Sequence, residues 1–185
     1  MSSSQVPVPN PLNGVASERG APPPAMPTSV QRTMGVLAWV MVIAGTLWVG
    51  LGHALMGGGG GWLVIFHLFF IMPVYGIVAL THAILVTLYG RRLPRFGAGP
   101  KASIAALVFT GLSLFYPLTV TDAGDAGPPL DARLTAWFGI PLDAVGVMQV
   151  ATLGGLIVSA LAMIVFDAIE LGKLPRAVTP PNPWQ

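Results

Sequence analysis

Cysteine is absent from the 185 residues, and charged side chains make up only 9% of them. The lack of cysteine excludes disulfides, thiolate metal ligands, a cysteine nucleophile, palmitoylation and a lipoprotein anchor. A soluble domain carries about 25% charged residues, so this chain has too few charges to coat a globule in water. Because 54% of the residues are hydrophobic, we expect lipid to be the solvent for most of the chain.

The hydrophobic residues are gathered into four long runs, at about 33–55, 62–89, 102–120 and 144–171. About 20 such residues, rising 1.5 Å each as an α-helix, cross the hydrocarbon core of a bilayer. We therefore predict an all-α polytopic membrane protein, with a bundle of four transmembrane helices in residues 34–172.

The first two runs are separated by five consecutive glycines, Gly57 to Gly61. Glycine breaks helices and favours turns, so this segment predicts a tight connection between two neighbouring spans. Pro73 stands in the middle of the second run, where its missing N–H and its ring predict a kink.

The segment between the last two runs carries apolar residues at helical spacing, at Leu130, Leu134, Trp137 and Phe138. This pattern predicts a short amphipathic helix that lies in the membrane interface. We expect Pro141 to end this helix. Asp143 is then a candidate N-cap for the fourth span.

Both ends of the chain are rich in proline, and residues 1–33 and 173–185 are predicted to be flexible tails. Eight of the nine Lys and Arg residues lie in these tails and in the 91–101 segment, and the remaining one is Arg133. Because Lys and Arg are retained on the cytoplasmic side, we expect both termini in the cytoplasm and the helices in a bacterial cell membrane. No basic stripe is interleaved with aromatics, so nucleic-acid binding is not expected.

Small residues recur every four positions on two of the runs. They are Ala102, Ala106 and Thr110 on the third, and Ala151, Gly155 and Ser159 on the fourth. Helices in lipid associate through close approach at small residues, so these ridges favour packing of the third span on the fourth. The alternative is that Ala and Gly are simply frequent in this sequence.

Two histidines, His53 and His67, are predicted at similar depth near the outer ends of the first two spans. A pair of neutral imidazoles is suited to ligate haem b iron or another metal, and a quinone or a lipid headgroup is a further possible contact. The simpler interpretation is a water-exposed His53 and a His67 hydrogen-bonded to a neighbouring helix. We therefore expect no cofactor and no metal ion.

His82 and Asp167 are predicted at comparable depth in the cytoplasmic half of the second and fourth spans. A histidine paired with a carboxylate can relay a proton inside a membrane. The simpler interpretation is a polar clasp that holds two helices together. Glu170, closer to the lipid headgroups, is expected to pair with Lys173 or with water.

The sequence has no Ser-His-Asp arrangement, carboxylate dyad or histidine-rich metal spacing, so we do not expect an enzyme. The favoured function is a non-catalytic accessory subunit of a larger integral-membrane complex, such as a respiratory-chain or transport assembly. One alternative is a small electron-transfer protein that binds haem or quinone through His53 and His67. Another is a homo-oligomeric channel or carrier with His82 and Asp167 in its pathway.

Overall fold

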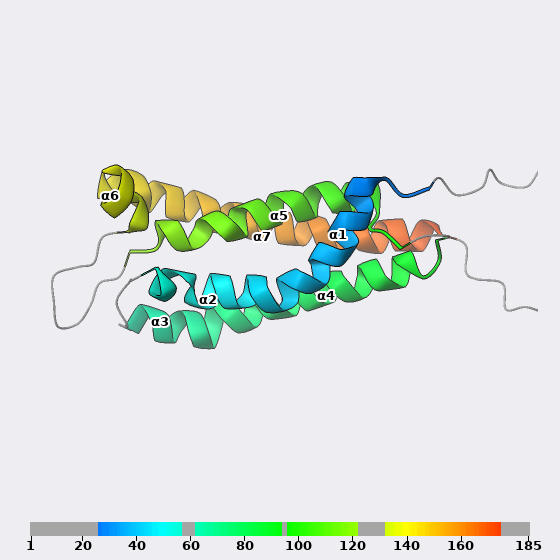
Figure 1. Cartoon of the computed structure of the whole chain (residues 1–185), viewed down its shortest axis with the longest axis horizontal. Coiled ribbons are helices and arrows are strands. Elements are labelled where there is room, and N and C mark those ends of the chain that lie inside the picture. Colours follow the sequence, from blue (N-terminus) through cyan, green and yellow to red (C-terminus); the bar gives the residue numbers. More distant parts are fainter. Residues whose placement is uncertain (1–25, 57–61, 94–95, 122–131, 175–185) are drawn as a thin grey trace, which may run out of the picture.

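The part of the chain that the structure describes folds into helices and no strands (Figure 1). The computed structural model describes residues 26–56, 62–93, 96–121 and 132–174. In this part of the chain, the helical stretches long and apolar enough to cross a membrane are Ser29–Leu55, Trp62–Gly90, Pro100–Thr119 and Leu142–Lys173. A short helix lies between the third and the fourth. The predicted fold class is thereby confirmed, while the proline-rich tails before residue 26 and after residue 174 and the glycine run lie outside the described residues.

The first span consists of α1 (Ser29–Val40), a π-helical turn η2 (Met41–Gly45) and α2 (Thr46–Leu55). It begins four residues before the predicted start at residue 33. The cause is a capping box, in which the Gln31 N–H donates to Thr28 Oγ1 (3.3 Å) and the Thr28 N–H donates to Gln31 Oε1 (2.7 Å). Residues 29–33, which we had assigned to the tail, therefore form the first turn of the span.

The second span consists of α3 (Trp62–Phe66), a π-helical turn η3 (His67–Ile71) and α4 (Met72–Gly90). The wide turn immediately precedes Pro73, and the Met72 N–H bonds to the carbonyl of His67, five residues earlier. The helix thus adjusts to the proline by widening. The first span also changes direction at its π-helical turn. α1, before η2, runs at a steep angle to α2, which follows it (Figure 1).

The short helix α6 (Arg133–Phe138) follows the third span, α5 (Pro100–Thr119), and precedes the fourth, α7 (Leu142–Lys173). Its end differs from the prediction. Gly139, with a left-handed backbone (φ 67°), ends α6 by donating its N–H to the Thr135 carbonyl (2.9 Å), so Pro141 is not the terminator. Leu130 lies outside the described residues.

The start of α7 also differs from the prediction. Pro141 occupies the N-cap position and no side chain caps this end. Asp143 was the expected N-cap, but it lies within the first turn of the helix. A carboxylate there still favours the helix electrostatically, because the amino end of a helix carries partial positive charge.

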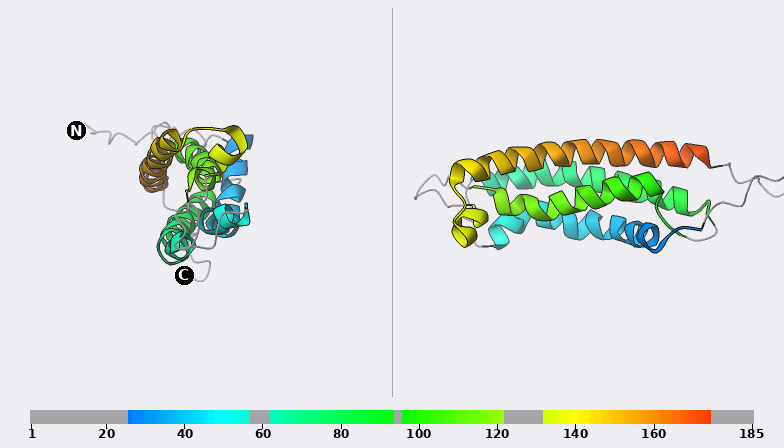
Figure 2. Two further views of the ribbon diagram at one scale, coloured as in Figure 1. Left: turned by 90° about the vertical axis from the view of Figure 1, so that its left-hand side faces the viewer. Right: turned by 90° about the horizontal axis from the view of Figure 1, so that it is seen from above.

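The four spans form one elongated bundle (Figure 2). α5 and α7 lie side by side along most of their length, α7 also packs on α4, and the first span packs on both α4 and α5. The start of α1, the α4–α5 connection and the end of α7 lie at one end of the bundle, which we call the basic end because Arg91, Arg92, Lys101 and Lys173 are there. The opposite end, which carries α6, is called the α6 end.

The bundle places polar side chains inside and large apolar side chains outside. His82, Ser113 and Asp167 are buried, whereas Phe69 is 72% exposed and Val150 is 73% exposed. In water this arrangement would leave many large apolar groups hydrated at a cost. In a bilayer the same outer surface meets lipid tails, which are as apolar as leucine, so the burial pattern agrees with the composition.

Candidate functional site

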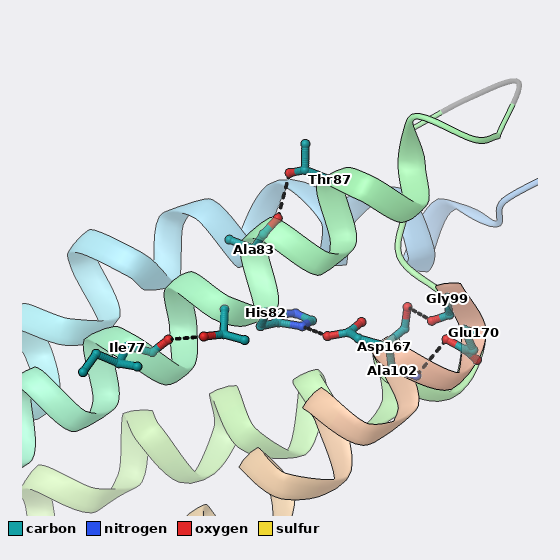
Figure 3. A network of polar contacts seen from close by, with 10 residues as sticks. Ile77, His82, Ala83, Thr87, Gly99, Ala102, Asp167 and Glu170 are labelled. Atoms are coloured by element: carbon teal, nitrogen blue, oxygen red, sulfur yellow. Dashed lines mark hydrogen bonds and ion pairs between the residues drawn. The ribbon is translucent and has the colours of Figure 1, made fainter. Parts of the chain in front are cut away.

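The second and fourth spans meet near the basic end at a contact between His82 on α4 and Asp167 on α7 (Figure 3). The Nδ1 of His82 lies 2.5 Å from Oδ2 of Asp167, and the two residues are only 4% and 3% exposed. With Nδ1–H donating to the carboxylate, the imidazole presents Nε2 as its other polar atom. The structure thus joins the two residues that the sequence placed at comparable depth.

All four spans contribute to the surroundings of His82. A cavity of about 10 Å³ adjoins its ring, and side chains from every span line it, including Met34, Met41, Thr110 and Met163. His82 lines this cavity and Asp167 does not. Within the described residues, His82 Nε2 is buried and has no hydrogen-bond partner.

One helical turn further along α7, Glu170 caps the amino end of α5 (Figure 3). Its carboxylate accepts hydrogen bonds from the backbone N–H groups of Lys101 (2.8 Å) and Ala102 (3.4 Å). The first N–H groups of a helix have no partner within the helix and carry partial positive charge. The carboxylate therefore satisfies them and ties the fourth span to the third. The partners found are thus backbone N–H groups of α5, which the expectation of Lys173 or water did not include.

Gly99, directly before α5, makes room for this cap. A Cβ atom built on Gly99 would lie 1.6 Å from Glu170 Oε2 and 2.4 Å from its carboxyl carbon. Ser103 adds a second contact, because its hydroxyl donates to the Gly99 carbonyl at 2.7 Å. The Gly99-Pro100 pair is a helix-start signal visible in the sequence, but its partner 70 positions later is visible only in the structure.

His67, in the π-helical turn η3, has both ring nitrogens in contact with protein groups. Nδ1 lies 2.7 Å from the Leu63 carbonyl, which fixes the proton there, and Nε2 lies 3.0 Å from the hydroxyl of Tyr116 on α5. Ligation of a haem iron by this nitrogen would require breaking the Tyr116 contact. This hydrogen bond to a neighbouring helix matches the simpler of the two interpretations of His67.

His53 lies in the last turn of α2 and is buried, so it is not the water-exposed residue considered as one alternative. Its helix packs against η3, which carries His67. The His67 ring, however, points its Nε2 at Tyr116. Haem or quinone binding by His53 and His67 stays a prediction. Among the described residues, no group of three or more histidine, aspartate or glutamate side chains is arranged to hold a metal ion.

A further polar contact joins α4 to α5 near the middle of the bundle and had no signal in the sequence. The Tyr75 hydroxyl donates to Ser113 Oγ (3.1 Å), and the Ser113 hydroxyl donates to the Phe109 carbonyl (2.6 Å). The Tyr75 and Phe109 rings stack with centroids 5.1 Å apart. Tyrosine has a large apolar ring and one polar hydroxyl group. In Tyr75 the ring packs on Phe109 and the hydroxyl bonds to Ser113.

The two small-residue ridges do not lie on a single seam. Gly155 and Ser159 of α7 line the seam with α5, where a Cβ on Gly155 would lie 2.9 Å from a Leu112 methyl group. Ala106 and Thr110 of α5 instead line the cavity beside His82. Of the remaining members, Ala102 is buried and Ala151 is exposed.

An apolar groove of about 430 Å³ runs along the outside of the bundle between α4 and α7. Its walls include Val74 of α4 and Ile157 of α7, which are 63% and 56% exposed, and its floor includes the buried rings of Tyr75 and Phe109. The groove is thus a concave, lipid-facing surface supported by the interior contacts described above.

Comparison of the chain with protein-family models, with curated proteins and with solved structures found no match in any of the three.

Proposed function

We propose that the chain is a non-catalytic accessory subunit of a larger integral-membrane complex. In this proposal the basic end faces the cytoplasm, because eight of the nine Lys and Arg residues lie in the terminal segments and the 91–101 segment, and such residues are retained on that side. The bundle then presents the α6 end to the outer surface. Its role is to hold a neighbouring subunit in position.

The observation that carries this proposal is the way the interior polar side chains are used. His82 with Asp167, Tyr75 with Ser113, and Glu170 with the first turn of α5 each join two different spans. Interhelical hydrogen bonds of this kind are worth about 1 kcal/mol each in membranes. Polar side chains that bond to a neighbouring helix make the bundle rigid. A conducting protein instead needs its polar side chains arranged along a continuous water-filled pathway.

The apolar groove between α4 and α7 is the surface that we assign to the neighbouring subunit. A transmembrane helix of a partner fits its chemistry, because the groove walls are aliphatic and aromatic and open towards lipid. Helix association in lipid depends on van der Waals packing, and a concave surface offers more of it than a flat one. The occupant proposed is therefore an apolar helix.

The proposal is tested by native mass spectrometry of the full chain, tagged in its source cells and extracted in a mild detergent. Wild type should retain a second membrane protein. Val74→Trp and Ile157→Trp should each release it, because the indole fills the groove. Val147→Trp is the matched control, since Val147 is 71% exposed on α7 but does not line the groove.

The outcomes that contradict the proposal are equally specific. A wild-type chain that emerges as a lone monomer carrying only lipid would oppose an accessory role. A partner that stays bound to both groove variants as firmly as to Val147→Trp would leave the subunit role standing and reject the groove as its contact surface.

A further inference from the structure

We propose that the cavity beside His82 is a binding site for one soft monovalent metal ion, Cu(I). The ligands are Nε2 of His82 and the thioether sulfurs of Met34, Met41 and Met163. This site is additional to the accessory role and does not depend on it, because it lies inside the bundle and away from the outer groove.

The imidazole of His82 is held in the way that a metal-ligating histidine is held. His82 is 4% exposed, its Nδ1 is engaged by Asp167, and its Nε2 is buried without a hydrogen-bond partner in the described part of the chain. A buried polar atom left unsatisfied costs about 1–3 kcal/mol. In metal sites the ligating histidine commonly has this arrangement, with one nitrogen bonded to a carboxylate and the other on the ion.

The walls of the cavity are rich in methionine. Three of the eight methionines in the chain line this one cavity, and they come from two different spans, Met34 and Met41 from the first and Met163 from the fourth. Thioethers are soft ligands that select Cu(I) over Mg²⁺ or Ca²⁺. The Met41 sulfur lies beside Gly45, where a built Cβ would be 3.0 Å from it. The unbranched methionine side chain has three rotatable bonds, so this sulfur can turn towards an ion in the cavity.

The charge near the cavity suits a monovalent cation. A cation buried in the low-dielectric interior of a bilayer requires a nearby anion. Asp167 supplies one formal negative charge through His82, which balances one positive charge and leaves a divalent ion uncompensated. Among the described residues, no Lys or Arg side chain lines the cavity. The site is therefore matched to a monovalent ion.

A water molecule is the competing occupant. The cavity of about 10 Å³ is of the size that one water requires. Buried waters make about three hydrogen bonds, whereas the strong polar groups that line this cavity are His82 and Thr110. The cavity is lined by three methionines, whose thioethers are soft ligands, and by His82, whose imidazole also suits copper. This set of side chains favours the metal ion over water.

The test is anaerobic titration of the detergent-solubilised full chain with Cu(I), in competition with a chromophoric Cu(I) chelator. The chain has no cysteine, so thiolates contribute no background. We expect one Cu(I) per chain. The Met41→Leu/Met163→Leu double variant, which conserves side-chain volume, should bind at least tenfold more weakly. Met148→Leu should bind as wild type, because Met148 does not line the cavity.

Two further measurements do not depend on the double variant being stable. X-ray absorption of the wild-type complex should show both sulfur and nitrogen neighbours of copper. Asp167→Asn should weaken binding about 10–100-fold, as expected for a residue that positions a ligating histidine. Absence of stoichiometric binding, a copper spectrum without sulfur neighbours, or equal affinity in the folded double variant would overturn the proposal in favour of a water site.

Discussion

At the scale of single residues, several polar side chains join one helix to another. The Trp39 indole N–H on the first span donates to Thr87 Oγ1 on the second (3.1 Å), and the Trp48 indole donates to the Leu114 carbonyl on the third (3.2 Å). An unsatisfied polar group in hydrocarbon costs several kcal/mol. Such contacts therefore fix which helix faces which neighbour, as well as adding stability.

The His82–Asp167 contact should have a measurable coupling free energy. A double-mutant cycle of His82→Ala and Asp167→Ala, read as the free energy of unfolding in detergent micelles titrated with dodecyl sulfate, should give about 1 kcal/mol, within the range found for such pairs in membranes. The matched cycle pairs His82→Ala with Thr152→Ala, because the Thr152 hydroxyl bonds within its own helix. A coupling no larger than that of the control cycle would contradict the proposed tie.

Part of this residue-scale pattern could be predicted from the sequence. His82 and Asp167 stand at similar distances from the basic ends of their spans, and a fixed rise of 1.5 Å per residue turns that spacing into equal depth. The partners of His67 and Tyr75 could not be predicted in this way. They depend on how far each helix is rotated about its axis, which packing decides.

At the scale of elements, the helices are shaped by local interruptions and by caps. The π-helical turns η2 and η3 fall within the first and second spans, and Met41 in η2 lines the cavity beside His82.

The start of α5 has no capping bond from Gly99, its own N-cap residue. It depends instead on Glu170 from the fourth span.

Gly99→Ala should remove this cap, because its Cβ would occupy the position of the Glu170 carboxylate. We expect a loss of about 1.5–3 kcal/mol in the free energy of unfolding, as for hydrogen bonds to a charged group, and faster amide hydrogen exchange at residues 101–103. Gly154→Ala is the matched control, since nothing lies within 4 Å of a Cβ there. Unchanged exchange in Gly99→Ala would show that Glu170 does not cap α5.

The element boundaries illustrate the limits of local sequence signals. Thr28 and Gln31 have the spacing of a capping box, yet their polar, proline-rich surroundings favoured assignment to a tail. Proline stops helices, so the sequence predicts the end of α6 at Pro141. The helix ends two residues earlier, at Gly139, which has a left-handed conformation. Asp143 was chosen as an N-cap by residue type alone, and the chain begins α7 one residue earlier, at Leu142.

At the scale of the whole molecule, the fold was predictable because run length and hydrophobicity are bulk properties. Four long apolar stretches and a short helix are what the structure contains among its described residues. α5 packs on α7, but the two small-residue ridges do not meet on that seam. The position of Ala106 and Thr110 beside the His82 cavity could not be predicted from the sequence. Residues spaced by four share one face of a helix, but the spacing does not show which helix that face contacts.

The bundle combines an interior held by polar contacts with an apolar groove on its outer surface. Polar ties hold the spans at their middle and at the basic end, and the groove between α4 and α7 remains open to lipid or to a helix. In this arrangement a partner subunit can bind without rearranging the bundle, because the groove floor is formed by buried rings that already have partners.

We propose that the bundle spans a membrane with its basic end in the cytoplasm. The most direct test of this proposal is labelling of single cysteines with a membrane-impermeant maleimide in intact cells, and the natural chain already lacks cysteine. Phe138→Cys on α6 and Gly172→Cys at the end of α7 place the thiol at exposed positions on opposite ends. We expect labelling of Phe138→Cys in intact cells and of Gly172→Cys only after lysis. Labelling of Gly172→Cys in intact cells would show that the basic end faces outwards.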